Sequence, residues 1–413
     1  MKLLLVATVL FGCQESNPNY CKGHPDNNCA ETGSGGDGGG AACTTSAQCS
    51  GGTPVCDTGT STCVPCMGTD VGACTDTTPI CQNEACVACA MHAQCTSQVC
   101  LPSGACGSDG DTAWVSASGA DENPCTMEAP CAHVSHALAA TTLPNIFVTG
   151  SIVDNIAITR GVTILAAAGA KVTGNASGAT ITVMTTGAVE IDDLEISGGQ
   201  GPSGYGVSLP SGAPNVTLRH VVIDTNDSTG IDAEAGTLTV TRSTLSGNRG
   251  GGLYLNRTSF DIENTFVTGN GVSGTSGSSV GGVTIGMLGG TMHTLQFDTI
   301  ADNMVATGLV GGVNCASVTP AITVANNIIY SNGTVELGGS NCNYAYSIIG
   351  PDGTVSGTDL NLPPQFKGGG DYHIFHGSPA RDHADPTATQ PIDIDDDTRP
   401  MGTARDSGAD ETQ

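Results

Sequence analysis

The chain has 413 residues, of which 59 are glycine and only 4% are aromatic. Its 39 acidic residues outnumber the 12 Lys and Arg residues and give a formal net charge of -27 at pH 7. This composition offers no basic surface for a phosphate backbone, which excludes nucleic acid as a partner. It also repels polyanionic glycans unless a bound cation bridges the charges.

The chain begins Met1-Lys2-Leu-Leu-Leu-Val-Ala-Thr-Val-Leu10-Phe-Gly-Cys13, which is typical of an export signal. The apolar run is too short to span a bilayer. Its end, Leu10-Phe-Gly-Cys13, resembles a bacterial lipobox. That resemblance implies a signal peptide over residues 1–12 and a lipid anchor on Cys13, which would hold the protein at the bacterial outer membrane or cell surface. An ordinary signal peptide, with Cys13 in a disulfide, is the alternative.

The cysteine count agrees with export. Of the 19 cysteines, 18 remain once Cys13 is set aside, and an even number suits a disulfide framework in an oxidising compartment. Cys21 and Cys29 are predicted to form a local pair. The Gly-rich composition of residues 13–42 predicts a flexible tether.

Residues 43–106 contain twelve cysteines in a degenerate repeat. Apolar residues are few there, so disulfides must replace a core, at about 2–4 kcal/mol each. The pairs Cys63/Cys66 and Cys86/Cys89 match a four-cysteine zinc pattern, but export and the interleaved cysteines favour disulfides. The segment resembles short Cys repeats of bacterial surface proteins, which implies a stalk or a protein-contact element.

Residues 107–170 are predicted to close one end of the following domain. A helix is expected over Ala132–Ala140, and strands over Asn145–Thr149, Ile156–Ile158 and Val162–Leu165. Cys125 and Cys131 are predicted to staple the loop before the helix. Such a cap is required because a stack of strands would otherwise expose its apolar end and an open ladder edge.

Residues 171–355 contain a recurring unit that is clearest in Val216-Thr-Leu-Arg-His-Val-Val-Ile223-Asp-Thr-Asn226. Its apolar residues alternate, which predicts strands rather than helices. A third short strand follows each copy and begins with Gly, as in Gly252-Leu-Tyr-Leu255. Three short strands in each coil of roughly 22 residues predict a parallel β-helix.

Each copy of the unit ends in an Asn, and the copies are predicted to stack in register. Buried amides can then hydrogen-bond along the stack, each contributing about 1 kcal/mol. An Asn also tolerates the left-handed backbone of a tight corner. The residues predicted to form this structural ladder are Asn226, Asn248, Asn270, Asn303 and Asn332.

The repeat resembles the right-handed parallel β-helix of the pectin-lyase-like superfamily over roughly residues 111–390. This resemblance implies an all-β fold, a right-handed single-stranded parallel β-helix preceded by the small disulfide-rich module. The superfamily contains polysaccharide lyases and hydrolases, but also adhesins and surface proteins without known activity, so the fold does not fix the chemistry.

Residues 356–413 resemble the closing segment of such proteins. Asp393, Asp395 and Asp397 supply hard oxygen ligands and could hold calcium, although a solvated acidic turn is the stronger interpretation. Cys315 and Cys342 fall on adjacent coils and are predicted to bridge them.

Three residues form the best catalytic constellation that the sequence offers. Asp193, His220 and Arg242 occupy one corner position on consecutive coils, and a lyase of this fold needs a basic residue together with calcium. Exposed corner residues are the alternative interpretation. Hydrolases of the fold carry paired Asp residues and a Gly-His-Gly, but only the Asp192-Asp193 pair is present.

Loops after the Asn corner, at residues 200–205, 271–281 and 304–311, could wall a groove for an extended ligand. They contain one aromatic residue, Tyr205, which predicts a sparse lining for sugars. The sequence favours a surface β-helix that binds or adheres to carbohydrate or surface-protein ligands, with no catalysis assigned and no cofactor except calcium. The alternatives are an extracellular polysaccharide lyase or glycoside hydrolase, and a purely structural envelope protein.

Overall fold

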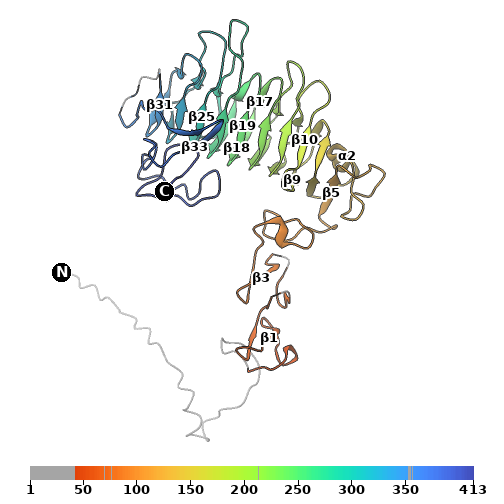
Figure 1. The fold of residues 1–413 in the computed structure, drawn as a ribbon. Helices are drawn as coiled ribbons and strands as arrows, with labels where there is room; N and C mark the ends of the chain where they lie inside the picture. Colours follow the sequence, from red (N-terminus) through yellow and green to blue (C-terminus); the bar gives the residue numbers. More distant parts are fainter. Residues whose placement is uncertain (1–41, 69, 76, 213, 352–354, 356) are drawn as a thin grey trace, which may run out of the picture. The chain divides into compact units, whose positions relative to one another are not determined.

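The computed structural model describes residues 42–413, except 69, 76, 213, 352–354 and 356 (Figure 1). The chain divides into two units, one reaching to Ala73 and including Asn83–Ala85, the other containing Cys74–Gln82 and Cys86–Gln413. Cys13, Cys21 and Cys29 lie outside the described residues, so the lipid anchor and the first disulfide remain predictions. Among the described helices, none is long and apolar enough to cross a membrane.

Short elements held by crossed disulfides make up the Cys-rich segment. The first unit has a 3-10 helix η1 (Ser46–Gln48) and an antiparallel hairpin of β1 (Val55–Asp57) and β2 (Thr62–Val64). Strands β3 (Ile80–Gln82) and β4 (Ala85–Val87) and the 3-10 helix η2 (His92–Gln94) follow. The printed bridges are Cys43–Cys56, Cys49–Cys63, Cys74–Cys86, Cys89–Cys100 and Cys95–Cys106.

These bridges decide between the two interpretations of the Cys-rich segment. Cys63, Cys66, Cys86 and Cys89 are all disulfide-bonded, so their sulfurs are not available as thiolate ligands. The zinc interpretation of these four cysteines is therefore wrong, and the segment is disulfide-rich.

Parallel strands of the described residues form three sheets in the second unit, here called sheets 1, 2 and 3 (Figure 1). Sheet 1 contains β5 (Thr112–Ser116), β6 (Asn145–Thr149), β9 (Val162–Ala166), β12 (Ala188–Asp192), β15 (Asn215–Arg219), β18 (Gly236–Thr241), β21 (Thr258–Glu263), β24 (Leu288–Gln296), β27 (Ile322–Ala325) and β30 (Cys342–Ala345). Sheet 2 contains β7 (Ser151–Val153), β10 (Lys171–Thr173), β13 (Glu195–Ser197), β16 (Val222–Asp224), β19 (Thr244–Ser246), β22 (Phe266–Thr268), β25 (Thr299–Ala301), β28 (Ile328–Tyr330) and β31 (Ile348–Gly350). Sheet 3 contains β8 (Ile156–Ile158), β11 (Ile181–Val183), β14 (Val207–Leu209), β17 (Thr229–Ala233), β20 (Gly251–Leu255), β23 (Val283–Ile285), β26 (Val313–Cys315) and β29 (Leu337–Gly339).

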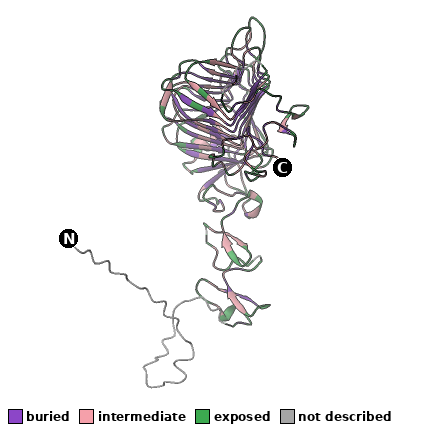
Figure 2. Cartoon of the chain, turned by 90° about the vertical axis from the view of Figure 1, so that its left-hand side faces the viewer, coloured by how far each residue is buried: buried purple, intermediate pink, exposed green. Residues whose placement is uncertain are grey.

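Each coil contributes one strand to each sheet in turn, as β15, β16 and β17 do. The register keeps like residues above one another: Leu218 pairs with Ile191 on one side and with Val240 on the other. These inward side chains are fully buried and form one continuous core along the stack. Buried residues, in purple, recur along the strands of the stack (Figure 2). No coil could bury its apolar face alone, so stacking is what stabilises each coil.

The Asn ladder lies at the corner between sheets 2 and 3. Each side-chain NH₂ donates to the next Asn Oδ1 at 2.8–2.9 Å, and the five Asn residues are fully buried. The Gly199 amide donates to Asn226 at one end, and Glu336 accepts from Asn332 at the other. Asp352, which the repeat predicts as the last member of the row, lies outside the described residues.

The left-handed backbone at this corner is not on the Asn, contrary to expectation. The positive φ belongs to the preceding residue, for example 50° at Thr225, 65° at Gly247 and 55° at Asp302. The position requires a side chain that both donates and accepts a hydrogen bond inside the coil, and the Asn amide does both. Tolerance of the left-handed region is not the reason for Asn here.

A second polar row, which the sequence analysis missed, lies at the corner between sheets 1 and 2. The Thr265 amide donates to Asp298 Oδ1 at 2.9 Å, and the Asp298 amide donates to Asn327 Oδ1 at 2.8 Å. The Asn327 amide continues the row to Ser347 Oγ. The residue before each polar member has a positive φ, as at Arg242, Asn264, Phe297, Asn326 and Tyr346, and Asp193 and His220 have the same conformation before the apolar Leu194 and Val221.

Glycine at the start of the sheet 3 strands has a steric reason. A Cβ on Gly206 would lie 2.3 Å from Ile223 Cγ2, and one on Gly252 would lie 2.4 Å from Val267 Cγ1. The central coils are too narrow at this point for a side chain, which explains the Gly at 206, 230, 252, 282 and 312.

Both ends of the stack are closed. The cap helix α2 (Val134–Ala140) begins two residues later than predicted, after a loop with the Cys125–Cys131 disulfide. At the other end lie β32 (Phe366–Gly368), β33 (Asp371–Ile374) and a Cys315–Cys342 disulfide. Beyond them, the fully buried Arg399 pairs with Glu411 at 3.0 Å.

Candidate functional site

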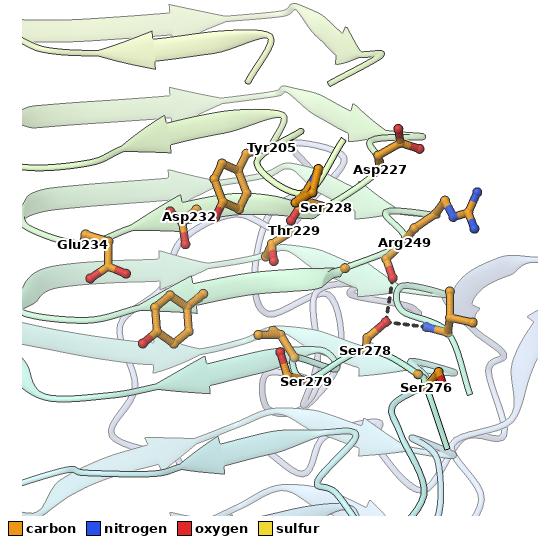
Figure 3. A pocket seen from close by; sticks show the side chains of 16 residues that line it. Tyr205, Asp227, Ser228, Thr229, Asp232, Glu234, Arg249, Ser276, Ser278 and Ser279 are labelled. Carbon is orange, nitrogen blue, oxygen red and sulfur yellow. Dashed lines mark hydrogen bonds between the residues drawn. The ribbon is translucent and has the colours of Figure 1, made fainter. Parts of the chain in front are cut away.

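A groove of about 640 Å³ lies along sheet 3, where the long loops leave the coils. In Figure 3, Tyr205, Asp232 and Glu234 lie on one side of it, and Asp227 and Arg249 on the other. The remaining wall is formed mainly by small residues of the loop at 276–280. The groove therefore combines aromatic, acidic and hydroxyl side chains, which are the groups that commonly line a site for a polar ligand.

The strand register places the central residues of the groove. Asp232 on β17 pairs with Tyr254 on β20, and both point outward because their strand neighbours point into the core. Tyr205 comes from the loop before β14, one coil away. Two tyrosines therefore flank the same carboxylate from neighbouring coils.

Burial and neighbouring carboxylates raise the pKa of several side chains in the groove. Burial raises the pKa of the Asp232 carboxyl to about 6, and the charge of Glu234 adds to this shift. Burial also raises the pKa of the Tyr205 and Tyr254 hydroxyls, with further contributions from the same two carboxylates. Glu234 is held in place by the Asn256 side chain, whose Nδ2 donates to Oε2 at 2.8 Å.

The opposite wall is held by hydrogen bonds of the loop backbone. Ser278 Oγ donates to the Arg249 carbonyl at 2.6 Å and accepts from the Val272 amide at 2.7 Å (Figure 3). The Gly201 amide donates to Asp227 at 3.0 Å. Among the described residues, the Arg249 guanidinium has no ion-pair partner, so it remains free to bind a ligand.

The expectation of a sparse aromatic lining is therefore corrected. Tyr205 was found from its loop, but Tyr254, Asp232 and Glu234 come from the strands and were missed. The signal was present in Gly252-Leu-Tyr-Leu255, because alternation with buried leucines sends Tyr254 outward.

The structure brings together the catalytic trio singled out from the sequence. His220 Nδ1 lies 3.5 Å from Asp193, and its Nε2 lies 3.3 Å from Asp396 without the geometry of a hydrogen bond. Arg242 pairs with the same Asp396, a residue that the sequence analysis did not consider. The guanidinium is thus neutralised by a carboxylate of the closing segment, which argues against a free base at this corner.

The Asp192-Asp193 pair does not converge on one site. Asp192 binds Arg219 at 2.8 Å on the face of sheet 1, and Asp193 turns toward His220 at the corner. Two carboxylates with separate basic partners do not form the acid and nucleophile of a hydrolase.

The three aspartates considered for calcium also diverge. Asp393 is fully buried and accepts the backbone amides of Asp395, Asp397 and Glu411. Asp395 faces His373 at 2.8 Å. The Asp393 and Asp395 carboxylates have separate partners, which favours an ordered acidic turn over a calcium site.

Two family models match parts of the chain. One describes a right handed beta helix region and matches residues 144–286. The fold is a right-handed parallel β-helix. The other model, a family of unknown function (DUF8331), matches residues 12–112 and includes the Cys-rich segment.

A solved structure, the crystal structure of pectate lyase Pel9A, is similar to the β-helix. The match has 13% sequence identity and a TM-score of 0.42, and covers 73% of this chain and 96% of that one. No curated protein matches the chain. The fold expected from the repeat is confirmed by the family model and the parallel sheets, whereas the lyase's activity does not transfer at this level of similarity.

Proposed function

We propose that this β-helix binds an extended polysaccharide, neutral or amine-bearing, in the groove along sheet 3. The observation that carries the proposal is the pair of tyrosines, Tyr205 and Tyr254, flanking the carboxylate of Asp232. Sugar rings present an apolar face that packs on aromatic rings, and their hydroxyls donate to carboxylates. A binding role at a cell surface would also suit the lipid anchor predicted at Cys13.

The charge of the groove supports this ligand class. Asp227, Asp232 and Glu234 outnumber Arg249, and the chain as a whole carries a formal charge of -27. A polyuronate would meet repulsion there, whereas a neutral or cationic glycan would not. On the neighbouring face, Arg219 and Arg242 are already paired with carboxylates, so neither supplies a ready site for a uronate.

The proposal is tested by measuring the binding of the full-length chain to neutral glucans, galactans, mannans and xylans, to chitosan and to polygalacturonate. Tyr254→Ala and Tyr205→Ala should each weaken binding by about tenfold, the effect of losing one aromatic contact. Tyr254→Phe should retain most of the affinity because the ring remains.

The matched control for these variants is Phe375→Ala, which removes an exposed aromatic ring outside the groove. It should bind like the unaltered chain. Binding to polygalacturonate alone, or affinities unchanged in both tyrosine variants, would contradict the proposal.

One observation favours glycoside hydrolysis as a second candidate. Asp232, with a pKa of about 6, lies beside Glu234, and glycoside hydrolases use one protonated and one ionised carboxyl group. A reaction that uses Asp232 as the acid would be fastest below pH 6 and would be lost as the pH rises through 6. Release of reducing ends that disappears in Asp232→Asn, while binding persists, would establish this function. Binding without release would leave a binding protein.

A further inference from the structure

A second cluster of titratable side chains lies outside the groove, where the closing segment meets sheet 2, and shares no residue with the groove. His373 comes from β33, Asp395 from the turn at 393–397, and Asp410 from the end of the chain. One donor atom from each lies within 4.8 Å of the others, and His373 Nε2 lies 2.8 Å from Asp395 Oδ2. Three separate segments therefore converge on one point.

The imidazole of His373 is fixed so that Nε2 faces this point. Its Nδ1 pairs with Asp371, two residues earlier on the same strand. The Phe266 ring packs edge-on against it, with centroids 5.2 Å apart and planes at 89°. A carboxylate on the far ring nitrogen is the arrangement that orients and strengthens a metal-binding histidine.

Asp410 is a largely buried residue, and only one of its two carboxylate oxygens accepts a hydrogen bond in the part of the chain that the structure describes. The residue is 6% exposed, and its Oδ2 accepts the Ile374 amide at 2.7 Å. Within the described residues, its other oxygen has no hydrogen-bond partner. Asp393 differs, since both of its oxygens are used by backbone amides. A carboxylate with one oxygen free of hydrogen bonds, lying beside a histidine and a second carboxylate, offers a ligand atom to a cation.

The cluster also has access to solvent. A cavity of about 660 Å³ is lined by Asp371, Tyr372, His373 and Asp395, and continues over sheet 2 to Phe266. An ion held by three protein ligands on one side could therefore complete its coordination with water or a ligand from the cavity.

We propose that His373, Asp395 and Asp410 bind one divalent transition-metal ion of the Zn²⁺ type. One imidazole nitrogen and two carboxylate oxygens are ligands that Zn²⁺ accepts, and Asp371 acts as the orienting partner of the histidine. Ca²⁺ fits less well because it takes about six to eight oxygen ligands. The site uses none of the groove residues, so it stands independently of carbohydrate binding.

The test uses the full-length, tag-free chain, stripped with chelator and titrated with Zn²⁺ in a calorimeter, with Co²⁺ as a spectroscopic probe. One ion should bind per chain, and Co²⁺ should give visible absorption bands. Asp395→Asn and His373→Ala should each weaken Zn²⁺ binding at least about tenfold, and Asp371→Asn should weaken it by a similar or smaller factor.

Two matched variants serve as controls. Asp397→Asn removes a neighbouring carboxylate of the same turn, and His376→Ala removes a neighbouring histidine, so both should bind like the unaltered chain. Circular dichroism of each variant separates loss of the site from loss of the fold. The proposal is overturned if the unaltered chain binds no Zn²⁺, if Asp395→Asn binds normally, or if Ca²⁺ at equal concentration displaces Zn²⁺.

Discussion

Asp298 is an acid at a position where the neighbouring coils carry the neutral polar residues Thr265 and Asn327. It is fully buried, its Oδ1 accepts the Thr265 amide, and its Oδ2 has no partner among the described residues. On the next coil, Asn327 uses its Nδ2 at the same position to donate to the Leu295 carbonyl at 3.0 Å. Burial raises the pKa of the Asp298 carboxyl well above its usual range, which favours the neutral acid over the carboxylate.

Replacing this acid with Asn should stabilise the protein at neutral pH. Because the folded pKa is raised, the stability associated with Asp298 is fully present below about pH 4 and is lost as the pH rises through the folded value. Asp298→Asn should therefore raise the free energy of unfolding by about 1–3 kcal/mol at pH 7 and leave it unchanged at about pH 4. Urea unfolding at the two pH values measures the difference.

The reverse substitution is the control. Asn327→Asp places a second acid in the row and should lose stability at pH 7, with partial recovery at low pH. Equal stability of Asp298→Asn and the unaltered chain at pH 7 would show that the buried acid carries no penalty.

At the scale of the element, the Asn ladder joins each coil to the next. Asn270 accepts from the amide and the side chain of Asn248 and donates to the Leu245 carbonyl and to Asn303. Asn270→Ala would leave groups on both neighbouring coils unpaired and should lower the free energy of unfolding by about 3 kcal/mol or more. Chemical unfolding measures it.

Asn175→Ala is the comparison, because Asn175 is exposed and outside the ladder. It should change the stability by less than about 0.5 kcal/mol. If the two substitutions had the same effect, hydrogen bonding along the ladder would not be stabilising the stack.

The ladder also shows how far the sequence predicts this fold. Its members were recognisable because the same residue type recurs at one place among alternating apolar residues. The left-handed residue before each Asn was not recognisable, since Thr225, Gly247 and Asp302 share no chemical type. The second polar row mixes Ser, Thr, Asp and Asn, which are interchangeable as acceptors and so leave no pattern. The groove was found only in part, because outward strand residues become a site only when neighbouring coils are in register.

For the whole molecule, the negative net charge and the burial of carboxyl groups both make the folded state more stable at lower pH. The chain has a formal charge of -27, and burial raises the pKa of Asp232 to about 6 and that of Asp406 to about 7. A carboxyl group whose pKa is raised in the folded state stabilises the protein at a pH below its ordinary pKa. For Asp232 and Asp406 this stability is lost as the pH rises through 6 to 7. Lowering the pH also reduces the repulsion among the acidic side chains.

The melting temperature should consequently be higher at about pH 5 than at about pH 8, as scanning calorimetry would show. Adding about 0.5 M NaCl should reduce the difference in melting temperature between the two pH values. Salt removes the contribution of repulsion between surface charges, because it screens exposed charges more than buried ones. A higher melting temperature at pH 8 than at pH 5, with or without salt, would contradict this account.

The joint between coils has a consequence for how such a protein changes over evolutionary time. In the central coils the ladder repeats every 22 residues, and each side-chain amide accepts from the coil before it and donates to the coil after it. Matching ends of this kind allow a whole coil to be duplicated or deleted in the gene without creating a mismatched joint. The length of the groove is therefore open to selection in steps of one coil, while the two caps remain unchanged.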